Sequence, residues 1–318
     1  MLDPLIVCGV ATFVGWVLAQ CAARFAFARK LPCATVERIS YGGVTRACMP
    51  VGGVILAFAF VCFSIPLGIL GMVPMAGSTL FLTGFALGFV NVPHILRGGL
   101  FLLLVCAVPD ALGAGFGAVL SPILKRQLTE ADLVPGIPAA LFAPALLGGG
   151  AFLVIVHGDQ SGLLGLNIGG AMAALHPLHR FPPRLTLGGS GVAVVAGATG
   201  FLVWHFLQHG SGLALLLLWS FVWAELAMRL WHGRVSDVPP FECARLRGEP
   251  EAGLTLATFS LNLAGVVLLW TVSRQPFAMQ IGAIGAILAL QLQFCAFLTR
   301  QEVKRSHSAE PPATSAES

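Results

Sequence analysis

Charge is scarce in this sequence. Only 10% of its 318 residues are Asp, Glu, Lys or Arg, whereas 57% are hydrophobic and the mean hydropathy is +0.87. A soluble globule of this size would need far more polar surface to face water. The composition therefore excludes a soluble protein and predicts one that lies in a lipid bilayer. No basic patch interleaved with aromatic residues accompanies the net charge of +4, so nucleic acid is not an expected partner.

Spacings typical of metal or redox sites are missing as well. None of the eight cysteines has CxxC or CxxH spacing, so neither disulfides nor zinc sites are expected. The histidines form no HExxH or similar ligand pattern, which argues against a metal cluster. We expect most of the following to lie at the membrane interface or at helix ends: His157, His176, His179, His205, His209 and His232.

Long apolar runs dominate the sequence instead. A helix needs about 20 mainly apolar residues to cross the hydrocarbon core of a bilayer. By this criterion the chain is an all-α polytopic transmembrane helix bundle. About nine spans are predicted, at 4–27, 51–73, 98–117, 133–156, 161–178, 187–206, 211–231, 254–272 and 277–298.

Basic residues give the orientation of the spans. Arg and Lys collect after the first, third, fifth, seventh and ninth spans, which makes those loops cytosolic. The N-terminus is then outside and the C-terminus inside. The apolar run at 77–96 contains Asn91, Pro93 and His94. We expect it to be interfacial or re-entrant, because one more full span would reverse every later loop.

The domain organisation is simple. Residues 1–300 are expected to form one integral-membrane domain, and 301–318 a disordered cytosolic tail rich in Ser, Ala, Pro and Glu. Asp3 before the first span and basic residues after it reverse the charge order of a cleaved signal peptide, so this span should be retained. Gly165 and Gly169 have the spacing that lets membrane helices approach closely, either within the chain or across a homodimer seam.

Short motifs stand in the loops and span ends that we predict to be cytosolic. In chain order they are Arg38 and Ser40 before Pro50, Gly52 and Gly53; Asp110 before Leu120-Ser121-Pro122 and Lys125-Arg126; Phe181-Pro182-Pro183 before Gly188 and Gly191; and Glu225 with Arg229. Over residues 1–247 their order and spacing resemble glycosyltransferase family 4, the bacterial polyprenyl-phosphate N-acetylhexosamine-1-phosphate transferases.

The resemblance implies a function in lipid-linked glycan or cell-envelope polysaccharide synthesis at the bacterial inner membrane. In that family a polyprenyl phosphate attacks the β-phosphate of a UDP-sugar and releases UMP. Mg²⁺ and cationic groups neutralise the approaching anions. Carried onto this chain, the resemblance implies catalytic roles for Asp110 and Glu225, with Asp110 also a Mg²⁺ ligand. It implies phosphate binding by Arg38, Arg180, Arg184, Gly188, Gly189 and Gly191.

The chain departs from the family pattern at several chemical positions. Pro109 replaces the first residue of an Asp-Asp pair, Gly189 replaces an aspartate, and Val192 replaces a serine. No histidine stands at 242–246, where the family has a histidine cluster. Between the fourth span and Phe181 one helix fills the interval where the family normally has two more. The pattern indicates a shortened, divergent member that has lost most of its catalytic positions.

Each candidate residue also has a simpler explanation. Asp110 could be a helix-end carboxylate in interfacial water, and Glu225 could pair with Arg229 at i,i+4. Glycines 188–191 could present N–H groups to a phosphate or form a tight turn. Arg180 and Arg184 could bind phosphate or only follow the positive-inside rule.

Two hypotheses follow. The first is a sugar-1-phosphate transferase that uses a UDP-sugar, polyprenyl phosphate and Mg²⁺. The second is a non-catalytic membrane protein that binds a lipid phosphate or regulates a partner in glycan assembly. A transporter is less favoured, because no paired buried charges or matching interrupted helices mark a central site.

Overall fold

The computed structural model describes residues 4–29, 37–41, 44–48, 52–53, 55–56, 131–132, 134, 136–179, 185–232, 240–247 and 249–299. The helices are α1 (Pro4–Arg29), α6 (Ile137–Val156), α7 (Gly162–His179), α8 (Gly188–Gln208), α9 (Gly212–Leu218), α10 (Ser220–His232), α11 (Pro240–Arg247), α12 (Glu251–Val272) and α13 (Phe277–Thr299). Apart from 52–53 and 55–56, the predicted spans at 51–73 and 98–117 lie outside these residues, as do the segment 77–96 and the tail at 301–318.

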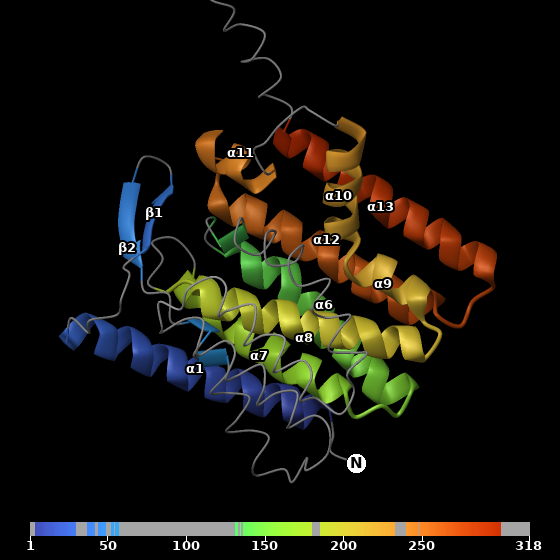
Figure 1. Cartoon of the computed structure of the whole chain (residues 1–318), viewed down its shortest axis with the longest axis horizontal. Helices are drawn as coiled ribbons and strands as arrows, with labels where there is room; N and C mark the ends of the chain where they lie inside the picture. The colour runs from blue at the N-terminus through green and yellow to red at the C-terminus, as the bar shows by residue number, and fades with distance from the viewer. Residues whose placement is uncertain are drawn as a thin grey trace, which may run out of the picture.

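The helices form a bundle in which consecutive helices pack together and helices distant in sequence also become neighbours. Helix α7 packs between α1 and α6, α6 packs on α12, and α12 in turn contacts α13 (Figure 1). The centre of the bundle is filled by fully buried side chains that include Phe142, Leu146, Ile168 and Phe206. The prediction of a helical bundle is confirmed for the part of the chain that the structure describes.

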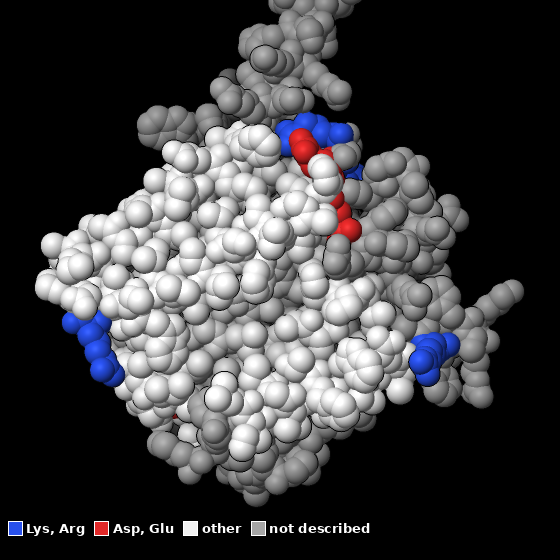
Figure 2. Space-filling view, turned by 180° about the vertical axis from the view of Figure 1, so that it is seen from behind, with Lys and Arg blue, Asp and Glu red and all other residues white. Residues whose placement is uncertain are grey.

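The composition of the helices supports a membrane location. Among the described helices, α6, α12 and α13 are long and apolar enough to cross a bilayer. Figure 2 shows one face of the molecule, on which Lys, Arg, Asp and Glu lie at the edges and the broad middle carries none of them. Large apolar side chains such as Leu256, Val267 and Phe297 are exposed on α12 and α13. Such a surface is stable in lipid and costly in water. The count of nine spans and their orientation remain predictions.

Close packing of α6 on α7 explains the glycine spacing. A methyl group at Gly165 would lie 2.7 Å from the carbonyl oxygen of Leu146, and one at Gly169 would lie 3.0 Å from the backbone nitrogen of Leu147. Only glycine allows the two backbones to come this near. These two glycines therefore serve packing within the chain.

The ends that we predict to be cytosolic meet at one end of the bundle. Gly136 before α6 contacts Thr255 near the start of α12 and His176 near the end of α7. The same glycine bonds to His179, and Asp132 bonds to Gly188 at the start of α8. The predicted directions of the spans at 133–156, 161–178, 187–206 and 254–272 are therefore consistent with the way these segments pack.

The predicted span at 211–231 is divided. Helix α9 ends before Trp219, whose backbone angles of φ −113° and ψ 34° lie outside the helical region, and α10 starts at Ser220 in a different direction (Figure 1). Helix α12 comes close at this break, because Gly265 has no side chain to keep it from the Leu217 carbonyl. Apolar periodicity alone does not reveal such a break.

A β-hairpin adds to the predicted all-α fold. Strands β1 (Glu37–Tyr41) and β2 (Val44–Cys48) pair antiparallel, with Tyr41 opposite Val44. The connection is therefore the two residues Gly42-Gly43, a pair typical of tight hairpin turns. All other regular elements in the described residues are helices. The hairpin lies in the first loop that we predict to be cytosolic.

Candidate functional site

A buried carboxylate joins three segments at the predicted cytosolic end of the bundle. Asp132 is 7% exposed, and its Oδ1 lies 2.8 Å from Nε2 of His179, which is 5% exposed. The backbone N–H of Leu187 donates to Oδ1 at 3.1 Å, and that of Gly188 donates to Oδ2 at 3.0 Å. One side chain thus links the segment before α6 with the last residue of α7 and the first of α8.

The partners of His179 fix its protonation. The Gly136 N–H donates to Nδ1 of His179 at 2.9 Å, so Nδ1 is an acceptor and carries no proton. Nε2 then carries the ring hydrogen and donates it to Asp132. Both nitrogens of this neutral imidazole are occupied. His179 therefore has no nitrogen left with which to take a proton from a substrate.

The local sequence dictates this geometry. Gly136 has φ +82°, a conformation that side chains rarely adopt, and it turns the chain into α6 while aiming its N–H at His179. A methyl group at Gly136 would also lie 2.9 Å from Oγ1 of Thr255 on α12. The glycine is required both for the turn and for the approach of α12.

Two of the family-like motifs come together beside this carboxylate. The Gly52 N–H donates to the Thr186 carbonyl at 2.9 Å, and the Gly53 N–H donates to the Leu187 carbonyl at 3.1 Å. A methyl group at Gly191 would lie 3.0 Å from the Gly53 nitrogen. The glycines at the start of the second predicted span and those of α8 therefore act as a close backbone contact between two segments.

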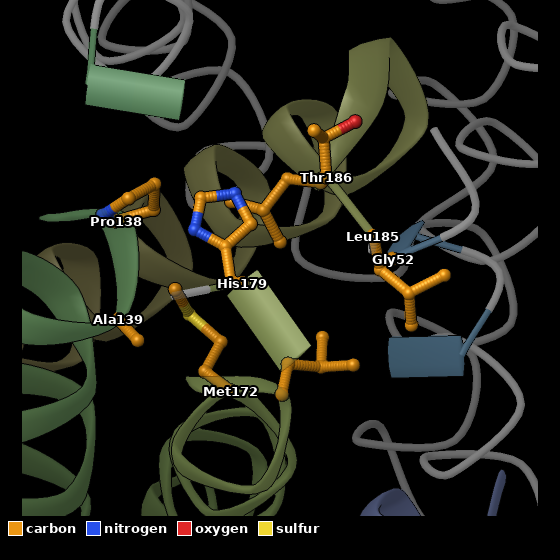
Figure 3. Close-up of a pocket in the computed structure, with 9 residues that line it drawn as sticks. Gly52, Pro138, Ala139, Met172, His179, Leu185 and Thr186 are labelled. Atoms are coloured by element: carbon orange, nitrogen blue, oxygen red, sulfur yellow. The ribbon is translucent and has the colours of Figure 1, made fainter. Parts of the chain in front are cut away.

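A small pocket opens next to the contact. It has space for about one water molecule and is lined mostly by apolar side chains, with His179 between Pro138 of α6 and Thr186 (Figure 3). Met172 of α7 lies below His179 in this view. None of the described residues that line the pocket carries a fixed charge. It offers apolar contact and gives no group that would bind a divalent cation.

The start of α8 already holds an anion. The N-terminus of a helix carries free N–H groups and a positive dipole end, which attract a negative group. Here that group is the Asp132 carboxylate, bound to the N–H groups of Leu187 and Gly188. Gly188 has φ +63°, so it also serves the turn into the helix. A phosphate at these two N–H groups would have to displace Asp132.

The structure describes only some of the other predicted site residues. Asp110, Arg180 and Arg184 lie outside the described residues, and Arg38 is described only as backbone in β1. Glu225 is 3% exposed on α10, in the helix that packs on α13. It interacts with other groups of the protein. Gly189 and Gly191 lie in the first turn of α8, where Gly191 is buried.

Metal binding has no visible site in the described part of the chain. No group of three or more His, Cys, Asp or Glu side chains there has the arrangement of a metal site. The predicted Mg²⁺ ligand Asp110 lies outside that part, so its role stays a prediction.

Asp132 is the residue that sequence reasoning missed. It is an acid directly before the predicted fourth span, and it belongs to none of the motifs named above. A carboxylate at the entry of an apolar run is a signal for a helix-end partner. The sequence does not identify that partner, because Gly188 lies 56 positions away.

Comparison with known proteins gives no family for this chain. No protein-family model matches the sequence, and no curated protein matches it with significance. The motifs quoted above therefore remain a resemblance.

Proposed function

We propose that this chain is a non-catalytic membrane protein built on a scaffold like that of the polyprenyl-phosphate sugar-1-phosphate transferases. It would act at the cytosolic face in lipid-linked glycan assembly, by binding an active partner or by binding a polyprenyl phosphate at a place other than the start of α8. One observation carries the proposal. The helix end that should bind phosphate is filled by the chain's own Asp132.

Two features support the same conclusion. Both ring nitrogens of His179 are occupied, so the buried His–Asp pair is not a general base. Gly189 stands where the family has an aspartate, and Pro109 stands beside the single Asp110. Phosphoryl transfer between two anions depends on metal-bound carboxylates and cations. A chain with one candidate Mg²⁺ ligand has lost most of that machinery.

The competing proposal is a transferase that works with Asp110 alone. Purified protein in lipid nanodiscs is incubated with polyprenyl phosphate, Mg²⁺ and a panel of UDP-N-acetylhexosamines, and UMP release is measured. We expect no release above that of the Asp110→Asn variant. Mg²⁺-dependent release that disappears in Asp110→Asn would establish the enzyme and refute our proposal. An active family member, run in parallel, controls for the substrates.

The binding half of the proposal is tested separately. Nanodisc-embedded protein is titrated with polyprenyl phosphate and, as a control, with the corresponding polyprenol, and bound lipid is counted by native mass spectrometry. We expect retention of the phosphate but not the alcohol. Equal retention of both lipids would mean that no phosphate is recognised and would leave only the partner-binding form of the proposal.

A further inference from the structure

A second polar cluster lies at the opposite end of α6, α7 and α8 from Asp132. It consists of His157, Asp159, His205 and His209, here called the His–Asp cluster. His157 and Asp159 belong to the turn between α6 and α7, whereas His205 and His209 belong to the end of α8. His157 and His209 are the residues that follow directly after α6 and α8, which confirms the prediction that histidines lie at helix ends.

Asp159 joins the two turns. Its Oδ2 lies 3.0 Å from Nδ1 of His205 and 2.8 Å from Nε2 of His209, while its Oδ1 accepts the Ser161 N–H at 2.9 Å. An ionised carboxylate only accepts, so each imidazole must present an N–H to the same oxygen. A proton added to either of these rings leaves its bond to Asp159 intact.

His157 occupies a different position in the cluster. Its ring stacks on that of His209 with centroids 4.5 Å apart and planes 15° apart, and it meets Phe152 edge-on at 5.5 Å. Its Nε2 lies 3.1 Å from Oγ of Ser211, at the start of α9. His157 therefore holds the α6–α7 turn to the α8–α9 turn by ring contact and by one hydrogen bond.

The charge balance of the cluster is asymmetric. Burial, and then the neighbouring His209, lower the pKa of His157 below its ordinary value of 6.5, and Asp159 only partly offsets them. Hydrogen bonds from His205, Ser161 and His209 outweigh burial and hold the pKa of Asp159 well below its usual range. Asp159 thus stays ionised throughout the range in which histidines titrate.

Charged groups on the neighbouring elements add little. Phe152 contacts Trp270 near the end of α12, so the turn from α12 to α13 lies at this end of the bundle. Arg274 in that turn is exposed, and among the described residues the charges that act on His157 are those of His209 and Asp159.

We propose that His157 is a proton-operated latch in the His–Asp cluster: at neutral pH it holds the α6–α7 turn close to the α8–α9 turn by its stack on His209 and its bond to Ser211, and it leaves this position when it becomes protonated, while Asp159 still joins the two turns through His205 and His209. A proton on His157 places a positive charge face to face with the ring of His209, and the stack separates. By the predicted orientation this end faces the outside of the cell, where the pH varies.

Hydrogen exchange of the full chain in nanodiscs tests the latch. The amides of Ser161, Gly162 and Leu163 all bond within the α6–α7 turn, so their exchange reports whether that turn loosens when His157 leaves the ring of His209. After correction for the intrinsic pH dependence of exchange, we expect about tenfold faster exchange over 157–163 and 207–213 at pH 5.0 than at pH 7.5. A tenfold change corresponds to a difference of one unit between the pKa of His157 in the closed form and in the open form. Peptides of α12 and α13 serve as an internal reference and should not change.

Two variants separate protonation from packing. His157→Phe keeps an aromatic ring for both ring contacts but cannot take up a proton, and we expect its exchange to change less than twofold between the two pH values. Both variants lose the hydrogen bond between His157 and Ser211. Ser211→Ala keeps the titrating ring, so it should respond as the wild type does. Both variants are first required to match wild-type protection of α12 and α13 at pH 7.5.

The remaining outcomes contradict the latch. An unchanged wild type would show that the cluster does not open. A response in His157→Phe equal to that of the wild type would assign the pH effect to another group. Equal acceleration in α12 and α13 would show global loosening instead of a local latch.

Discussion

The same three helices carry a histidine–aspartate pair at each end, and the two ends are built differently. At one end, Asp132 and His179 are almost fully buried and bond mainly to backbone N–H groups. At the other, Asp159 bonds to two histidine side chains, of which His209 is 33% exposed. A buried pair whose atoms are all occupied is a structural lock, whereas an accessible cluster with spare proton positions responds to pH.

The difference shows what each pair can do. His179 has a single stable tautomer, because a backbone N–H occupies Nδ1. Within the Asp159 cluster, a proton can be added without breaking a bond. The two His–Asp pairs therefore differ in their chemistry, and the groups that surround each pair decide the difference. These groups are backbone N–H groups at one end and further histidine side chains at the other.

Removal of Asp132 should have the largest effect. Asp132→Ala leaves the Nε2–H of His179 and the N–H groups of Leu187 and Gly188 without their acceptor in a buried site. We expect a loss of about 3–5 kcal/mol in the free energy of unfolding. Thermal and denaturant unfolding in detergent measure it. The matched deletion Asp159→Ala, at the other end, should cost less; an equal or larger cost would remove the distinction between the two ends.

The turn before α6 comes next. Gly136→Ala forces a side chain into φ +82° and into contact with Thr255, and we expect it to cost about 1–3 kcal/mol. The measurement is again the free energy of unfolding in detergent. Gly158→Ala is the control, because Gly158 has φ +66° but nothing within 4 Å of the added methyl group. If both substitutions cost the same, the contact with α12 contributes nothing and only the backbone conformation matters.

The charge of Asp159 should have the smallest effect and a defined pH dependence. Its pKa is lowered in the folded state, so its contribution is present above the ordinary value of 3.8 and is lost as the pH falls below it. We expect Asp159→Asn to cost about 1–2 kcal/mol at pH 7. The difference from wild type should shrink as the pH falls below about 4. A difference that grows below pH 4 would have the wrong sign.

Much of the helical framework follows from apolar run length. The predicted runs at 4–27, 133–156, 161–178, 254–272 and 277–298 are helices whose ends lie within a few residues of those predicted. A helix that crosses a membrane is recognised by the apolar composition of about 20 consecutive residues, so the local sequence is enough to find it.

What the sequence could not provide depends on long-range contacts. The break at Trp219 lies where α12 approaches through Gly265, and nothing in the local run 211–231 indicates that contact. Gly42-Gly43 was a local signal for the hairpin and could have been used. The bond from Asp132 to Gly188 connects residues with no common motif, so only the folded structure identifies it.

The occupancy of the α8 N-terminus can be measured directly. Unfolding temperatures of wild type and Asp132→Ala are compared in detergent with rising concentrations of inorganic phosphate, with chloride of equal ionic strength as the control. If Asp132 fills the anion site, phosphate raises the unfolding temperature of Asp132→Ala and leaves that of the wild type unchanged. A rise of the same size in both proteins would show that the site is open to phosphate in the native chain, and would contradict the proposal of a closed, non-catalytic scaffold.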